Sequence, residues 1–135
     1  MSSIDDLCRS VLDDIEGGLG VAVIDLHSGL LLGAAHSVPY FTQTNLDALA
    51  AAAVEMFRGR LTSSIEELIS SERGTPNRHM IDEIQMSTPG TYHFMLVLPN
   101  KPDALISLIT TKRANLGAGW SSLRRATAVL EPMLP

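Results

Sequence analysis

Cysteine, aromatic residues and positive charge are all scarce in this sequence. The single cysteine, Cys8, has no partner for a disulfide within the chain, and aromatic residues make up 4% of the composition. Lys and Arg number 10 against 15 Asp and Glu, which gives a formal net charge of −5. Because Lys and Arg drive binding to nucleic acids and to anionic membranes, this balance argues against either as a partner.

Targeting signals and long apolar runs are absent as well. The first residues lack the basic and apolar regions of a signal peptide. No apolar run reaches the roughly 18 residues that a membrane-spanning helix requires. We therefore expect a cytoplasmic protein.

Residue patterns that carry chemistry are equally scarce. The histidines His27, His36, His79 and His93 show no HxxH, HxH or cysteine pairing of the kind that defines a metal site. No serine lies in a G-x-S-x-G elbow, and the paired acids are sequence neighbours whose side chains diverge on a helix. Residues 17–20 are rich in glycine but follow a helix, the reverse of a phosphate loop. We predict a noncatalytic protein with no cofactor and no metal site.

Apolar residues, by contrast, are abundant enough for one substantial core. They make up 45% of the 135 residues, against 19% for charged residues. A chain of this length buries about two thirds of the surface that its unfolded state exposes. We predict a single domain spanning residues 1–135, with some apolar surface left over for a partner or a second copy.

The first part of the chain predicts a helix followed by a β-hairpin. Apolar residues recur at helical spacing over residues 4–15, with Cys8 among them as an inert core thiol, and Gly17 and Gly18 stop the helix. The stretch 19–33 reads as two strands joined by a tight turn at residues 25–29. Because residues 21–24 are apolar on both faces of their strand, we expect helices on both sides of the sheet, in three layers.

An alanine-rich helix is predicted next, over residues 46–58. Thr44 and Asn45 offer N-caps, and Gly59 bends or ends the helix. Small side chains allow another backbone to approach closely, but the helix propensity of alanine explains the composition equally well. Residues 63–67 resemble a capping box that starts a further turn or two, and residues 73–77 form a connector.

The second half of the chain predicts three strands and a final helix. Residues 80–86 alternate imperfectly and carry three polar side chains, as an edge strand would. Turns at residues 89–90 and 99–103 separate two further strands, and a helix runs from an Asn115 cap to near Pro132. The predicted fold is α+β, with the element order αββαβββα.

Two features of the final helix leave alternatives open. Trp120 is either a core residue or a binding hot spot, and its place on the apolar stripe favours the core. Arg124 and Arg125 either face a partner or form a salt bridge with the acidic first helix.

With its elements in this order, the sequence resembles the roadblock/dynein light chain family, including bacterial members related to the gliding-motility GTPase activator. The resemblance rests on the first amphipathic helix, the hairpin of residues 20–29, the alanine-rich residues 49–54, and residues 114–116 entering the last helix. It implies a three-layer α/β/α, profilin-like fold. In that fold the first and last helices lie on one face of a five-stranded antiparallel sheet and the middle helix on the other.

The resemblance also implies a homodimer in which the middle helices and the third strands pair across a two-fold axis. That arrangement would place five residues near the dimer interface: Ala50, Ala53, Phe57, Ile84 and Met86.

For function, the resemblance implies a noncatalytic regulator or scaffold, often a partner of small Ras-like GTPases. The Ser- and Glu-rich stretch after Gly59 departs from the family pattern. The alternative is a small-molecule sensory domain of the profilin-like or PAS-like type. Its pocket would lie between sheet and helix and be lined by residues such as Tyr92 and Met95.

Overall fold

The computed structural model describes residues 3–73 and 81–135. The elements in chain order are α1 (Ile4–Asp14), β1 (Gly18–Asp25), β2 (Leu31–His36), α2 (Gln43–Arg58), α3 (Arg60–Arg73), β3 (Glu83–Ser87), β4 (Thr91–Leu98), β5 (Lys101–Thr111), α4 (Leu116–Leu130) and the short 3₁₀ helix η1 (Glu131–Met133). The five strands form one sheet in the order β2-β1-β5-β4-β3, with every neighbouring pair antiparallel. The predicted α+β class and strand sequence are confirmed, and α3 is an additional helix.

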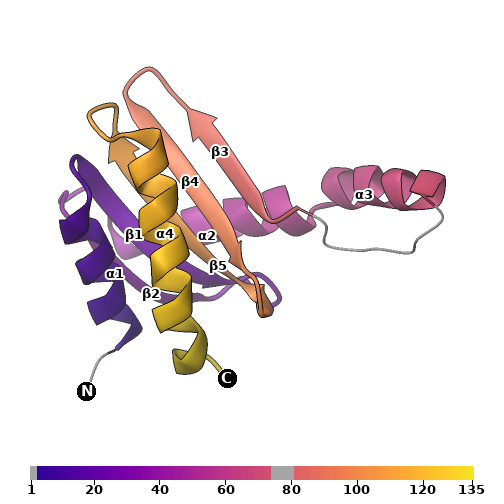
Figure 1. Ribbon diagram of the computed structural model, residues 1–135, viewed down its shortest axis with the longest axis horizontal. Coiled ribbons are helices and arrows are strands. Elements are labelled where there is room, and N and C mark those ends of the chain that lie inside the picture. The colour runs from indigo at the N-terminus through magenta and orange to yellow at the C-terminus, as the bar shows by residue number, and fades with distance from the viewer. Residues whose placement is uncertain (1–2, 74–80) are drawn as a thin grey trace.

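The elements stack in three layers (Figure 1). Helices α1 and α4 lie side by side on one face of the sheet, and α2 crosses the opposite face. Strand β1 shows why both faces are covered, because its alternate side chains enter two separate cores. Val21 and Val23 pack under α1 and α4, whereas Ala22 and Ile24 pack under α2. The three-layer arrangement expected from this strand is confirmed.

Helix α1 starts with a reciprocal cap and ends earlier than expected. The Ser3 hydroxyl accepts a hydrogen bond from the Asp6 N–H, and the Asp6 carboxylate accepts one from the Ser3 N–H, each at 3.1 Å. The helix ends at Asp14, and Ile15 turns into the core in an extended conformation. Gly17, with φ of +79°, therefore shapes the turn into β1 instead of capping the helix.

The predicted turn between β1 and β2 is confirmed, and Asp25 organises it. The Asp25 carboxylate accepts hydrogen bonds from the His27 N–H at 3.0 Å and from the Ser28 hydroxyl at 2.8 Å. The bond from Ser28 is the main reason that the pKa of Asp25 lies below its ordinary value. Gly29 completes the turn with φ of +77°.

Helices α2 and α3 follow each other with a break at Gly59. The N-cap of α2 is Thr42, two residues before the predicted caps, and its hydroxyl accepts a hydrogen bond from the Asn45 N–H at 3.3 Å. As predicted, α2 ends at Gly59, but α3 begins at once with Arg60. The capping box expected at residues 63–67 is wrong, because the Ser63 N–H already donates to the Gly59 carbonyl at 2.9 Å within a 14-residue helix.

The connector predicted at residues 73–77 falls largely outside the described residues, as do His79 and the start of the strand predicted at residue 80. The strand itself, β3, lies at the edge of the sheet as expected. Helix α4 starts at the predicted cap, where the Asn115 side chain accepts a hydrogen bond from the Ala118 N–H at 3.0 Å.

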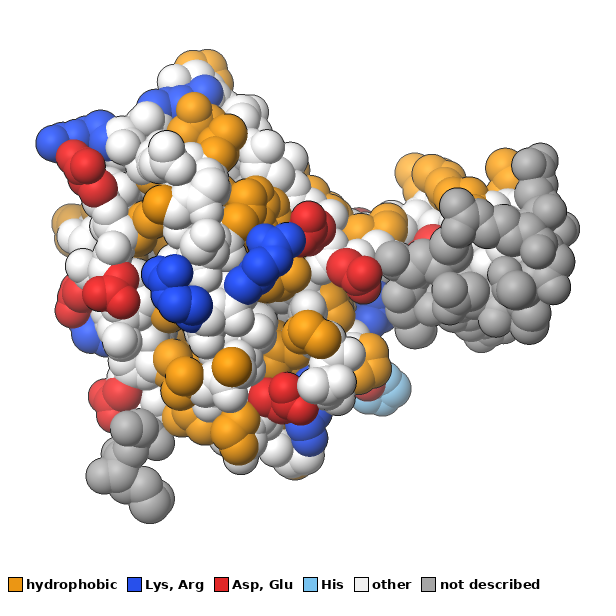
Figure 2. Space-filling view, in the orientation of Figure 1, with side chains coloured by type: hydrophobic (Ala, Val, Ile, Leu, Met, Phe, Trp, Pro, Cys, Tyr) orange, Lys and Arg blue, Asp and Glu red, His pale blue; other side chains and the backbone are white. Residues whose placement is uncertain are grey.

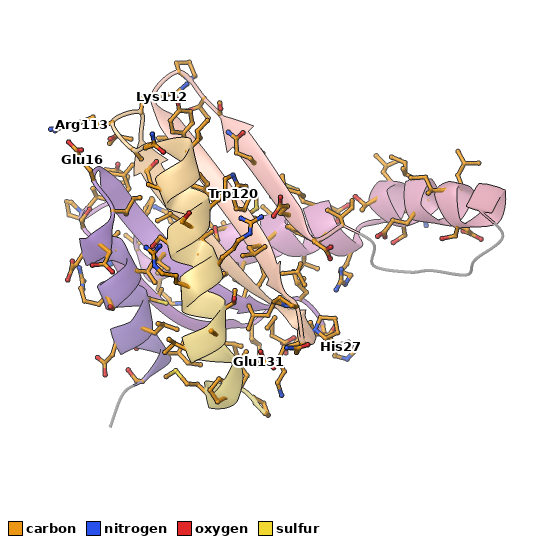
Figure 3. The ribbon with its side chains drawn as sticks, viewed as in Figure 1. Glu16, His27, Lys112, Arg113, Trp120 and Glu131 are labelled. Atoms are coloured by element: carbon orange, nitrogen blue, oxygen red, sulfur yellow. The ribbon has the colours of Figure 1, made fainter. Side chains whose placement is uncertain are left out.

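The side chains of α4 bear on both open alternatives (Figure 3). Trp120 is half-buried and packs edge to face on the buried Phe94, with ring centroids 5.4 Å apart. Arg124 lies over the Trp120 ring and pairs with Glu83 of β3 at 2.7 Å, so the salt bridge expected with the first helix is wrong for this residue. The link between the ends of the chain is instead the exposed pair of Arg113 and Glu16, at 3.3 Å.

Candidate interaction surface

The residues of α2 that face the sheet form one apolar line at helical spacing. Ala50, Ala53 and Phe57 belong to it and are at most 2% exposed, packed against the strands of their own protomer. The small alanine side chains thus bring α2 close to its own sheet. All three are interior residues of the protomer, so a contact between α2 and a second copy would use other side chains of this helix.

The flank of α2 that faces β5 offers such side chains. Leu49 is half-buried and borders a narrow hollow with Ser107 and Ile109 of β5. Ala52 and Met56 follow on the same flank by helical spacing, Ala52 exposed and Met56 half-buried. We call Leu49, Ala52 and Met56 the α2 flank.

The two edges of the sheet differ in how their backbones are satisfied. At β2, the Asp5 carboxylate accepts a hydrogen bond from the Ala34 N–H at 2.9 Å, and the Arg9 guanidinium donates to the His36 carbonyl at 3.2 Å. Side chains of α1 therefore cover this edge. Within the described residues, β3 is paired along one side only, by β4. An edge strand open in this way is a template for pairing with another chain.

Next to this open edge, part of the sheet face lies beyond α2. Ile84 and Met86 of β3 stand opposite Met95 and His93 of β4, and these pairs point to the α2 side. Ile84 is half-buried and Met86 is 38% exposed. We call Ile84, Met86 and His93 the β3–β4 corner. Two of the residues that the resemblance places near a dimer interface, Ile84 and Met86, belong to it.

His93 is the titratable member of the corner. Its Nε2 lies 3.0 Å from the Thr91 hydroxyl, and the ring is half-buried. Burial lowers the pKa of His93 below its ordinary value, because it penalises the charged imidazolium. Folding therefore favours the neutral form of the ring.

Helix α3 carries a second apolar surface. Four side chains that we call the α3 stripe are spaced as one helix face and are strongly exposed: Leu61 79%, Ile65 57%, Leu68 64% and Ile69 38%. Figure 2 shows hydrophobic side chains gathered on this helix where it stands away from the body. Single exposed leucines are common on proteins, but a contiguous stripe is typical of an interaction site.

Among the described side chains of α3, the buried ones are polar. Glu66 and Ser70 are buried, and the Glu66 carboxylate accepts a hydrogen bond from the Ile81 N–H at 3.3 Å. This bond ties α3 to the chain just before β3. The helix thus has the reverse of the usual arrangement, in which the apolar face is covered and the polar face is exposed.

A cavity of about 340 Å³ lies between the β1–β2 turn, the β4–β5 turn and the last residues of the chain. Its lining mixes charged and apolar side chains, among them Asp25, Lys101, Asp103 and Leu134. The predicted pocket lined by Tyr92 and Met95 is wrong, because adjacent residues of a strand reach opposite faces, Tyr92 under α4 and Met95 under α2.

Reactive groups are few in the part of the chain that the structure describes. Cys8 is fully buried, and burial, with a smaller contribution from Asp5, raises the pKa of its thiol to about 12. The core position predicted for this residue is confirmed. No group of three or more His, Cys, Asp and Glu side chains among residues 3–73 and 81–135 is placed to hold a metal ion. Nor does any helix in these ranges have both the length and the apolar character to cross a membrane.

The five-stranded antiparallel sheet and its covering helices match solved structures of roadblock/LC7 domains, which confirms the fold that the sequence resemblance implies. The Roadblock/LC7 domain from Streptomyces avermitilis superposes with a TM-score of 0.72 at 12% identity, covering 97% of each chain. MglB from Myxococcus xanthus gives 0.69 at 14% identity, covering 94% of this chain and 90% of that one. The gliding protein MglB from Thermus thermophilus gives 0.70 at 16%, covering 95% and 85%.

Sequence comparison adds nothing to this likeness. No description of a known protein family matches the chain, and no curated protein sequence matches it. At identities of 12% to 16%, the likeness to the solved structures establishes a shared fold. Function has to be argued from the surface.

Proposed function

We propose that residues 1–135 form a single domain that works in the cytoplasm as a homodimeric, noncatalytic regulatory or scaffold module, with a small Ras-like GTPase as its partner. The observation that carries this proposal is the open edge of β3 beside the partly exposed β3–β4 corner. An unpaired strand next to uncovered apolar side chains favours association with another protein chain. The GTPase is suggested by the sequence resemblance to relatives of the gliding-motility GTPase activator, and a gliding protein is among the solved structures that share the fold.

The proposed dimer pairs the two β3 strands in antiparallel fashion across a two-fold axis. Such pairing satisfies the open backbone edge of both copies at once, and it joins the two sheets into one. Ile84 and Met86 then lie close to the axis, and the α2 flank of each copy faces that of the other. Ala50, Ala53 and Phe57 support this interface from within, because they hold α2 on its own sheet.

Two neighbouring alanines of α2 provide a matched test of the dimer. Ala52 lies on the α2 flank, whereas Ala51 is exposed on the side of the helix turned away from it. Ala52→Arg places a charge in the proposed interface and should convert dimers to monomers, whereas Ala51→Arg should leave the dimer intact. The measurement is molar mass by light scattering during size-exclusion chromatography. A monomeric wild-type protein at all concentrations tested would overturn the proposed dimer.

The partner is tested by affinity capture from the native cytoplasm, with the bound proteins identified by mass spectrometry. Binding is then repeated with the purified partner loaded with GDP or with a nonhydrolysable GTP analogue. Nucleotide-dependent binding of a Ras-like GTPase is the expected result. If no GTPase binds in either state, the regulatory assignment fails while the dimer is still judged by its own test.

A ligand-sensing function is the second candidate, and one observation favours it. The cavity of about 340 Å³ beside the β1–β2 turn falls within the range of small-molecule pockets. A ligand bound there would raise the thermal midpoint of the protein at concentrations above its dissociation constant. A thermal-shift screen with a metabolite panel separates this function from the regulatory one.

A further inference from the structure

We propose that α3 is an exchange arm whose apolar stripe packs across the β3–β4 corner of the second copy. This inference rests on the homodimer proposed above and adds a contact to it. Each copy would donate one arm and receive the other, so that two exposed apolar surfaces of the same chain cover each other.

Helix α3 leaves the body of the protomer at the side where β3 forms the edge of the sheet (Figure 1). The helix starts directly after α2 at Gly59, and the bond between Glu66 and the Ile81 N–H ties it to the chain just before β3. From there it extends past β3, the edge strand, into the space beside the sheet (Figure 1). A second copy paired through β3 would occupy that space.

Antiparallel pairing of the two β3 strands determines which of their ends lie side by side. Across a two-fold axis, the Glu83 end of one β3 lies beside the Ser87 end of the other. Because α3 leaves its own protomer near the Glu83 end, it passes over the Ser87 end of the partner's strand. At that end, the partner's Met86 and the partner's His93 form the outer part of the corner on the α2 side.

Helix α3 is also long enough to reach the β3–β4 corner of the second copy. A helix of 14 residues is about 21 Å long at 1.5 Å per residue. Neighbouring strands lie about 4.8 Å apart, so the arm is long enough to cross β3 and β4 of the second copy. Its stripe begins at Leu61, the second residue of the helix, so apolar side chains run along most of this path.

The charge of α3 argues against a membrane as the alternative cover for the stripe. Residues 60–73 contain three glutamates and two arginines. A helix that lies on an anionic membrane carries an excess of Lys and Arg on its polar face. A second copy of this chain, by contrast, offers the neutral and apolar surface that the stripe needs.

The test is a disulfide between two separately purified variants. Ile65→Cys carries the thiol on the stripe, and Met86→Cys carries it in the corner, while the buried native Cys8 stays unreactive. The two variants, one of them tagged, are mixed and oxidised, and a tagged–untagged covalent dimer is expected. Ser63→Cys, exposed on the opposite side of α3, is the matched control and should not link to Met86→Cys.

The affinity of the dimer also tests whether α3 packs on the second copy, and this measurement needs no oxidation. Leu68→Ser removes a leucine from the stripe and should raise the dimer dissociation constant about tenfold or more, whereas Ser63→Ala should leave it unchanged. Dimers of normal affinity without the Ile65–Met86 link would overturn the arm and leave the proposed dimer standing. A monomeric wild-type protein would overturn both.

Discussion

At the residue scale, Ala53 marks the difference between an interior and an interface position on one helix. It is 2% exposed and packs against the sheet, whereas its neighbour Ala52 is exposed. Ala53→Arg should therefore lower the free energy of unfolding by more than about 3 kcal/mol, because it buries a large, unpaired charge in a packed core. Ala52→Arg should leave the free energy of unfolding of the isolated protomer nearly unchanged.

Urea unfolding at a concentration low enough for monomers checks this pair of variants. The same unfolding data show whether Ala52→Arg is folded. This matters for the dimer test, because a variant that fails to fold gives no information about an interface. Equal destabilisation by the two arginines would mean that α2 sits differently on the sheet.

His93 should make stability depend on pH. Burial lowers its folded pKa below the ordinary value of 6.5, and the neighbouring Met86 and Ile109 carry no charge. The unfolded chain then binds more protons than the folded one, so stability rises with pH. The contribution of neutral His93 is fully present above its ordinary pKa and is lost as pH falls through the lowered value.

The measurement is the free energy of unfolding from about pH 7.5, above the ordinary pKa of histidine, down to about pH 5. His93→Gln should flatten the fall seen for the wild-type protein at the acidic end. Identical slopes for His93→Gln and the wild type would rule out His93 as the group responsible.

At the element scale, Gly59 sets the angle between α2 and α3. Its φ of −68° and ψ of 166° are open to any residue, but a Cβ here would collide with the Glu55 carbonyl. Gly59→Ala should therefore change the angle between the helices, and the helix propensity of alanine favours a straighter path. The change should be visible as a shifted distance between spin labels on Asp47 of α2 and Glu67 of α3.

A control for this measurement is Gly90→Ala, in a turn where an added Cβ meets nothing within 4 Å. It should leave the distance unchanged. A wild-type distance in Gly59→Ala would mean that the break is fixed by contacts of α3 and not by the glycine.

The same two helices show how far sequence patterns predict this fold. Strand alternation, turn residues and the Asn115 cap are local signals, so the strands and α4 could be placed from them. The positions 61, 65, 68 and 69 also fit a helix, but the serines at 63 and 64 suggested a cap, which the hydrogen bond from Ser63 to Gly59 excludes. The spacing of the apolar residues was therefore sufficient to predict α3, but the serines suggested a later start for the helix.

What could not be predicted is the direction in which each apolar stripe faces. Phe57 on α2 and Leu68 on α3 are both apolar residues on amphipathic helices, yet the first is fully buried and the second is 64% exposed. The periodicity of a helix gives the existence of a stripe but not the surface that covers it, which depends on tertiary packing. The resemblance, and not the helical pattern, placed Ala50, Ala53 and Phe57 near the proposed interface, and their burial in the protomer could not be read from either.

At the scale of the whole molecule, helices cover the two faces of the sheet to different extents. Helices α1 and α4 lie side by side over one face, whereas α2 alone crosses the other (Figure 1). The β3–β4 corner belongs to the less covered face, beside the open edge of β3. A second copy bound there would complete the apolar packing, which links dimerisation to folding stability.

This linkage predicts a thermal midpoint that depends on protein concentration. A dimer that binds folded chains but not unfolded ones raises the midpoint by mass action as concentration rises. Leu68→Ser, which weakens the proposed contact of the arm, should lower the midpoint most where the wild-type protein is fully dimeric, and the two proteins should converge on dilution. Differential scanning calorimetry over a hundredfold concentration range, with Ser63→Ala as control, measures both effects. A midpoint independent of concentration in the wild-type protein would mean that each chain is stable alone, and the apolar surface would then need a different partner.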